Sequence, residues 1–346
     1  VNLDRIILSA NWMGACGVKG QDAALYDGVS AASSFCQELG VSIPVGKDSL
    51  SMKTSWKDQA GEDKTVVSPV SLVVSAAAPV YDIRNNLLPM FAESVRDSSL
   101  LLIDLGHGKD RLGGSVYSQV TQRFDSVTPD MEDPKELKKF LELIRSLSAK
   151  GAILAYHDRS DGGLAAALCE MMFASHVGVE IVADALVSKD RTLNQALFNE
   201  ELGAVIQVAR GRAAEVERDF EAAGMGWSLK YLGNLTQDDH LNIYLEGKCV
   251  LSEDRVDLQK AWNEVSWQIA RMRDNPECAD SEYELISDKH NGGLVLTMGF
   301  DPEENLAAPF INTGVRPKVA ILREQGVNSQ NEMASAFLQA GFDAVD

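Results

Sequence analysis

The sequence predicts an α/β protein with more than one domain. The chain has 346 residues, which is enough for two or three separate hydrophobic cores. Segments typical of buried strands alternate with helical periodicities across residues 96–265, and this alternation favours an α/β or α+β sandwich. Residues 317–346 repeat the order strand, helix, strand, which is the first βαβ step of a doubly wound domain.

Composition limits the classes of function. The chain carries 51 acidic and 32 basic residues, and its net charge of −19 disfavours binding to nucleic acid or to an anionic membrane surface. It contains no run of 18 apolar residues, so we expect no membrane-spanning segment. The five cysteines form no CxxC pair, as expected for reduced thiols in a cytoplasmic protein.

The first predicted segment, residues 1–95, combines strands with one long helix. Residues 5–10 have the apolar character of a strand, and residues 23–39 have apolar side chains at a helical period. Residues 66–78 are rich in β-branched and small side chains, so we expect a single strand there, limited by Pro79.

The second predicted segment, residues 96–265, contains the alternating elements of the sandwich. The expected strands are residues 100–105, 152–155, 204–208, 228–232 and 241–245. The expected helices are residues 134–150, 164–173 and 213–223.

The remaining residues form a predicted connector and a predicted new domain. Residues 266–316 are rich in charged residues and proline near both ends, which predicts an irregular connector. Residues 317–346 contain a strand at 318–323, a helix at 330–340 and a second strand from 342. Because one such unit cannot bury its own core, we expect the chain to be part of a longer protein.

The turn between the strand at 152–155 and the helix at 164–173 is the main candidate site. Ligands of α/β proteins bind outside the carboxyl ends of strands, and Asp158 there has the carboxylate that Mg²⁺ prefers. Ser160 can reach a phosphate, and Gly162 and Gly163 allow a phosphate to approach the backbone. The spacing alone leaves the alternative open that Ser160 or Asp161 only caps the helix and the glycines only make a tight turn.

Three further features have weaker functional interpretations. Lys47 could supply a positive charge to a phosphate, or it could pair with the neighbouring Asp48. Residues 112–115, Leu-Gly-Gly-Ser, could hold an anion at a helix start, or could only be a close packing turn. The run Gly-His-Gly-Lys at 106–109 lacks the spacing of a Walker A loop, so no phosphate role follows from it.

Five blocks, in a fixed order, carry a resemblance to a known family. They are residues 8–13 (LSANWM), 44–53 (PVGKDSLSMK), 112–115 (LGGS), 157–164 (HDRSDGGL) and 198–203 (FNEELG). With these blocks the chain resembles, over essentially all its residues, the large single-chain phosphoribosylformylglycinamidine synthases, or formylglycinamide ribonucleotide amidotransferases.

The resemblance implies a domain order. Residues 1–95 would be the later part of a second synthetase half-barrel, and residues 96–265 an α/β sandwich similar to aminoimidazole ribonucleotide synthetase. Residues 266–316 would connect this sandwich to the start of a class I glutaminase at 317–346. The other synthetase half and the rest of the glutaminase, with its nucleophilic cysteine, would lie elsewhere in the parent protein.

The resemblance also implies a reaction, ligands and site residues. The family uses ATP, Mg²⁺ and glutamine to convert formylglycinamide ribonucleotide into its amidine in the cytoplasm, for purine biosynthesis. The family has the motif Asp-x-Ser-Asp-Gly-Gly, which corresponds to residues 158–163 here. By this resemblance, Asp158 would be a Mg²⁺ ligand and Ser160 would contact the bound ATP or ADP. None of the five cysteines has a nucleophile context, so no catalytic residue is assigned and residues 1–346 alone are expected to be inactive.

Two other functions stay open. The synthetase half to which residues 1–265 would belong could be a non-catalytic structural part. Its nucleotide would then be bound and not hydrolysed, and Asp158 would serve an auxiliary site. A standalone domain similar to aminoimidazole ribonucleotide synthetase is a further alternative, but the glutaminase-like start at Lys318 argues against it.

Overall fold

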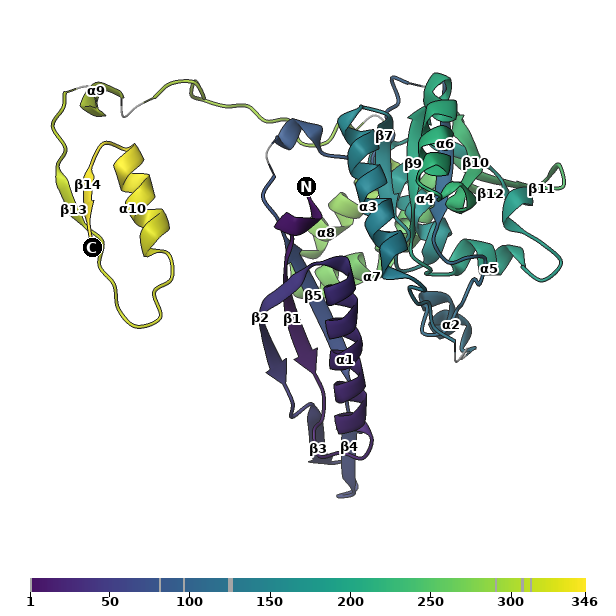
Figure 1. Cartoon of the computed structure of the whole chain (residues 1–346), viewed down its shortest axis with the longest axis horizontal. Helices are drawn as coiled ribbons and strands as arrows, with labels where there is room; N and C mark the ends of the chain where they lie inside the picture. The colour runs from purple at the N-terminus through teal and green to yellow at the C-terminus, as the bar shows by residue number, and fades with distance from the viewer. Residues whose placement is uncertain are drawn as a thin grey trace. The chain divides into compact units, whose positions relative to one another are not determined.

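Two units make up the chain, residues 1–289 and residues 290–346 (Figure 1). The structure is a computed structural model that describes residues 2–80, 82–95, 97–123, 127–289, 291–305, 308–311 and 313–346. The first unit contains a small sheet and a large sheet, and the second contains a short pair of strands with one helix.

The small sheet is built on a βαβ step. Its strands are β1 (Ile7–Met13), β2 (Ser42–Ser49) and β5 (Ser71–Ala77), in the order β2-β1-β5. β1 is parallel to β2 and antiparallel to β5. The helix α1 (Gln21–Leu39) connects β1 to β2 and lies along this sheet (Figure 1), as the apolar period at 23–39 predicts.

The single strand predicted at residues 66–78 is wrong. Two strands occupy this region: β4 (Asp63–Val67), which pairs with β3 (Lys53–Lys57), and β5, which pairs with β1. Pro69 lies between them and has no N–H to donate to a ladder, so the chain leaves one sheet there and enters the other.

The large sheet has seven strands in the order β12-β11-β8-β10-β6-β9-β7. Its strands are β6 (Ser98–Asp104), β7 (Ile153–Asp158), β8 (Gly178–Val182), β9 (Gly203–Ala209), β10 (Leu229–Thr236), β11 (His240–Leu245) and β12 (Lys248–Asp254). Both β6 and β7 are antiparallel to β9 and therefore run in the same direction. Their last residues, Asp104 and Asp158, consequently lie at the same edge of the sheet.

Hydrophobic clusters cover both faces of this sheet. Leu100 and Leu102 of β6 belong to one cluster, with the buried face of α4 (Gly163–Ser175). The alternate residues Leu101 and Ile103 belong to the other cluster, with α3 (Pro134–Ala149) and α6 (Ala213–Ala222). Because successive side chains of a strand point to opposite faces, one apolar strand serves both cores, and the predicted α/β sandwich is confirmed.

Residues 266–273 and 276–287 are helical, so the irregular connector predicted from residue 266 is wrong there. The helix α7 (Arg255–Arg273) is followed by α8 (Pro276–Glu284). Asn275 accepts hydrogen bonds from the N–H groups of Glu277 and Cys278, and proline is favoured at the first helical position. The Asn-Pro pair therefore starts a new helix, which stacks on α7 through the rings of Trp267 and Tyr283, 4.2 Å apart.

The second unit has the predicted order of elements. β13 (Lys318–Ala320) and β14 (Asp343–Val345) are parallel, and α10 (Gln330–Gln339) lies between them in the sequence. A short helix, α9 (Ala308–Ile311), precedes them. Among the helices that the structure describes in either unit, none is long and apolar enough to cross a membrane.

Replacing Gly233 with alanine should destabilise the large sheet. A Cβ atom on Gly233 would overlap the carbonyl oxygen of Glu180 on the neighbouring strand β8, and overpacking of this kind costs about 1–3 kcal/mol or more. Gly211→Ala is the matched control, since a Cβ there meets no atom within 4 Å. Urea unfolding should show a clear loss only for Gly233→Ala, and equal stabilities of the two variants would contradict this packing.

Amide hydrogens of the β13–α10–β14 unit should exchange faster than those of β6 and β9. α10 buries none of its side chains, whereas all seven residues of β6 are buried. Segments with few buried apolar contacts open at a lower free energy than core strands. Hydrogen exchange measured by mass spectrometry on the whole chain would refute this if residues 318–345 were as protected as residues 203–209.

Candidate functional site

Three of the sequence motifs meet at the carboxylate of Glu200. One is the turn at 158–163 after β7, the second is the loop at 112–115 before α2 (Val116–Thr121), and the third is the loop that contains Glu200 itself. The Oε1 atom of Glu200 accepts hydrogen bonds from the N–H of Val116 and the N–H of Gly162, both at 2.9 Å. A negative side chain thus stabilises the positive ends of two helices and joins their starts.

The glycines of the turn are required by close packing. Gly162 and Gly163 have φ of +80° and +70°, and a Cβ on Gly163 would lie 2.6 Å from the carbonyl oxygen of Asn199. Gly162 is the N-cap of α4, with no side-chain cap. The alternative that Ser160 or Asp161 caps this helix is therefore wrong, whereas the tight-turn interpretation of the glycines is supported.

Asp158 is the last residue of β7 and is exposed. Its Oδ1 accepts a hydrogen bond of 2.5 Å from the hydroxyl of Tyr156, and no described residue donates to its Oδ2. Burial and this bond together raise the pKa of Tyr156, so the phenol stays protonated as a donor. Asp158 also borders a cavity of about 650 Å³ that Arg145 and Asn85 help to line.

These features fit a carboxylate that takes part in holding a hard cation. Asp158 offers one free oxygen to solvent, which is the donor type that Mg²⁺ prefers. The part of the chain that the structure describes contains no group of three or more His, Cys, Asp or Glu side chains placed to hold a metal ion. Ser160 is exposed, and its hydroxyl makes no hydrogen bond to another described residue.

Two other polar residues have partners of their own. Lys47 donates to the hydroxyl of Ser49 at 2.6 Å and does not pair with Asp48, so the predicted alternative of that pair is wrong. His157 bonds Glu170 of α4 through Nε2 at 2.8 Å and the carbonyl oxygen of Asp158 through Nδ1 at 2.7 Å. Both ring nitrogens of His157 are therefore occupied by structural contacts.

Beneath the turn lies a buried charge cluster that sequence reasoning missed. Asp104, at the end of β6, forms two hydrogen-bonded salt bridges. Its Oδ1 accepts a hydrogen bond from Arg159 at 2.7 Å, and its Oδ2 accepts one from Lys230 at 3.1 Å. Arg191 approaches the same carboxylate at 3.6 Å and pairs with Asp110. Burial alone would raise the pKa of Asp104, but Arg159 and Lys230 outweigh it and hold this pKa well below its usual range.

The loop at 199–201 completes the polar framework. Asn199 donates to Asp110 at 2.9 Å, and Glu201, fully buried, binds Arg111 through two bonds of 2.7 Å. This bidentate pairing raises the pKa of Arg111. The sequence contains one signal of this cluster, an acidic residue, Asp104, at the end of an apolar strand. Its partners Arg159 and Lys230 are distant in the chain, so the sequence did not identify them.

Asp104→Asn should destabilise the fold by about 3–5 kcal/mol at pH 7, because the remaining cations lose their buried counter-charge. The pKa of folded Asp104 lies below its unfolded value of about 3.9, so its stabilisation is fully present above that value and is lost progressively as the pH falls from there towards the lower pKa of the folded state. Urea unfolding from pH 7 to pH 3 should show the gap between wild type and Asp104→Asn narrowing below about pH 4.

The control for this change is Asp97→Asn, which removes a carboxylate that pairs with Arg210 at 2.6 Å on the surface. It should have little effect at any pH, since exposed ion pairs contribute little. A gap between wild type and Asp104→Asn that did not depend on pH would contradict the ionised state of Asp104.

Family comparisons divide the chain into three parts. Residues 1–79 match the FGAR-AT PurM_N-like domain. Residues 98–246 match the C-terminal domain of AIR synthase related proteins. Residues 316–346 match the CobB/CobQ-like glutamine amidotransferase domain.

Solved structures share the fold at low identity. Phosphoribosylformylglycinamidine synthase II from Thermotoga maritima is 12% identical, with a TM-score of 0.51 over 98% of this chain and 44% of that chain. T. maritima PurL complexed with AMPPCP is 11% identical, with a TM-score of 0.52 over 96% and 44%. The HypE–HypF complex is 18% identical, with a TM-score of 0.52 over 72% and 77%.

The chain spans less than half the length of the T. maritima PurL structures that it matches. At these identities the structural likeness shows the fold alone. An FGAR-AT PurM_N-like domain, an AIR synthase C-terminal domain and a glutamine amidotransferase segment match in this order along the chain, and together these matches support an FGAR amidotransferase.

Proposed function

We propose that this chain is part of an ATP- and glutamine-dependent ligase that converts formylglycinamide ribonucleotide into formylglycinamidine ribonucleotide. The observation that carries the proposal is the order of the three matched domains along one chain. The domain division is proposed with it: half-barrel at 1–95, sandwich at 96–265, a connector at 266–316 whose first part contains the end of α7 and all of α8, and glutaminase start at 317–346. The cytoplasm is the proposed location, in keeping with five free cysteines.

The turn after β7 is the proposed nucleotide site of this part. The solved T. maritima PurL with AMPPCP supports nucleotide binding by this fold. Asp158 would place its free oxygen on a Mg²⁺ ion, and Ser160 would donate its hydroxyl to a phosphate oxygen. The bound ion would neutralise phosphate charge, which is the main requirement of phosphoryl transfer.

The geometry limits what the turn itself can do. The N–H of Gly162, the first donor at the start of α4, is already bonded to Glu200. The proposed contacts are therefore side chains, and the remaining metal ligands would be phosphate oxygens, water or other protein groups. No described cysteine or histidine lies in the turn with a free nucleophilic or proton-transferring role, since His157 is held by Glu170.

Asp158→Asn should abolish the Mg²⁺ dependence of ADP binding to the chain, because an amide lacks the charge of a metal ligand. Ser160→Ala should weaken binding to a smaller extent. Asp161→Asn is the matched control, since Asp161 is an exposed acid of the same turn that is given no metal role. Isothermal titration with ADP, with and without Mg²⁺, tests this, and equal binding by all four proteins would reject the site.

The same change in the complete synthase separates a working site from an auxiliary one. At an auxiliary site, Asp158→Asn should lower the melting temperature in the presence of Mg²⁺ and ADP with a modest loss of turnover, because a bound ligand stabilises the native state. At a working site, turnover should fall by orders of magnitude while the fold survives. We expect the auxiliary result, and a large loss of turnover at an unchanged melting temperature would overturn it.

A further inference from the structure

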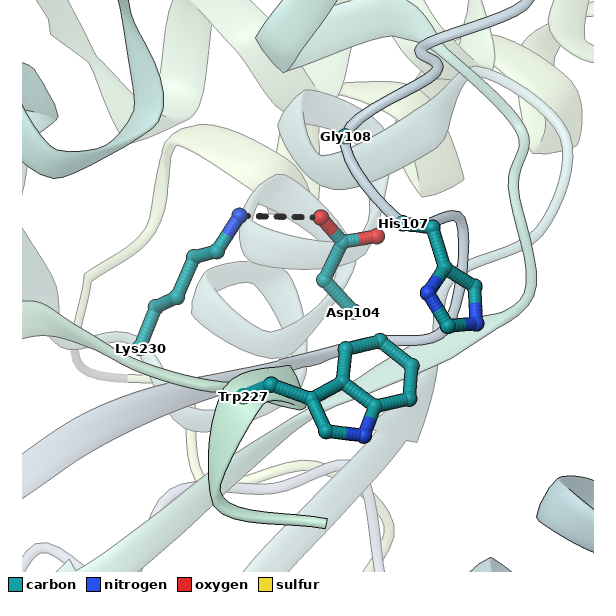
Figure 2. Close-up of a pocket in the computed structure, with 5 residues that line it drawn as sticks. All are labelled: Asp104, His107, Gly108, Trp227 and Lys230. Atoms are coloured by element: carbon teal, nitrogen blue, oxygen red, sulfur yellow. Dashed lines mark hydrogen bonds and ion pairs between the residues drawn. The ribbon is translucent and has the colours of Figure 1, made fainter.

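A second hollow lies on the same sheet edge, at the end of β6. It has a volume of about 390 Å³ and is lined by Asp104, His107, Gly108, Trp227 and Lys230 (Figure 2). This volume lies within the range of small-molecule sites. None of the residues that form the proposed nucleotide site lines it, so it is a separate feature of the molecule.

Two aromatic rings form one wall of this hollow. The rings of His107 and Trp227 stack with their centroids 4.0 Å apart and their planes inclined by 20°. Nε2 of His107 bonds Glu136 at 2.8 Å, which fixes the imidazole, and the other ring nitrogen lies on the side of the hollow (Figure 2). Trp227 is 41% exposed although it is a large apolar side chain, so part of the indole is available to a ligand.

The opposite wall carries positive charge. Lys230 directs its ammonium group to Asp104 and contacts the Oδ2 atom of that carboxylate at 3.1 Å (Figure 2). Asp104 does not repel an anion as a free carboxylate would, because it is shared by Lys230, Arg159 and Arg191. In the ion pairs that the structure describes, these three cations pair with two carboxylates, Asp104 and Asp110, while the nearby Glu136 is bonded to His107.

The loop above the hollow offers backbone donors. His107 and Gly108 have φ of +53° and +70°, a conformation that holds this loop in a tight turn. Their N–H groups have no acceptor among the described residues, whereas the neighbouring Gly106 donates to Asp104 at 3.1 Å and Lys109 to Gly106 at 3.0 Å. Backbone N–H groups beside a lysine are a common arrangement for binding phosphate oxygens.

We propose that this hollow binds a small phosphorylated molecule that carries a planar ring. The phosphate would lie between the ammonium group of Lys230 and the free N–H groups of His107 and Gly108. The ring would pack against the exposed part of Trp227. This site does not depend on Asp158, on Ser160 or on the proposed ligase reaction.

Phenyl phosphate is the probe, titrated into the whole chain in a Mg²⁺-free buffer and followed by calorimetry. Lys230→Met keeps the length of the side chain and removes its charge, and Trp227→Ala removes the ring. Each change should weaken binding by about tenfold or more. Lys109→Met is the matched control for charge, because Lys109 belongs to the same loop but pairs with Glu132. It should bind like wild type.

Further arms separate the parts of the proposal. Inorganic phosphate should bind more weakly than phenyl phosphate, and phenol should not bind measurably. Asp158→Asn should bind phenyl phosphate like wild type. If the proposed nucleotide site at Asp158 is rejected, the phenyl phosphate titration therefore still tests the hollow. If Lys230→Met does not fold, Trp227→Ala decides the result. Absence of phenyl phosphate binding, or binding unchanged by Trp227→Ala, would overturn the proposal.

Discussion

The position of the site loops depends on the buried carboxylate of Asp104. Asp104 ends β6, Arg159 belongs to the turn after β7, and Lys230 belongs to β10, so one side chain connects three parts of the sheet edge. Arg159 also donates to the carbonyl oxygens of Glu201 and Leu202, at 2.6 and 3.1 Å. A buried carboxylate needs such partners because an uncompensated charge in the interior is strongly unfavourable, and this requirement fixes the loops relative to the strands.

In the loop at 199–201, three consecutive side chains also provide partners for polar groups of neighbouring elements. Asn199 bonds Asp110, Glu200 bonds the starts of α2 and α4, and Glu201 bonds Arg111. A loop lacks the ladder hydrogen bonds of a strand, so its polar groups must find partners elsewhere. Here side chains of the loop perform that role, and each connects a different element to the edge where β6 and β7 end.

The sequence predicts those parts of the fold that leave a local pattern. α3, β6, β7 and the β13–α10–β14 order follow from helical periodicity and from apolar runs. β8 was missed because it has only five residues, β12 because charged residues occupy both of its ends, and α8 because it follows a segment rich in charged residues. The contacts of Glu200 span 38 and 84 residues, and no local pattern can predict them. The location of the turn was predicted correctly, whereas the roles of Asp158 and Ser160 remain predictions.

β9 and Arg159 lie between the two hollows at this sheet edge, and they contact residues that border each hollow. Asp104 is opposite Gly203 and Asp158 is opposite Ala204, so adjacent residues of β9 lie between the two acidic strand ends. The backbone N–H of Arg159 bonds Gly203 at 2.9 Å, while its guanidinium group bonds Asp104. Arg159 directly follows Asp158 in the chain. The geometry of the Asp158 turn is therefore set together with the charge balance around Asp104, because one fully buried side chain takes part in both.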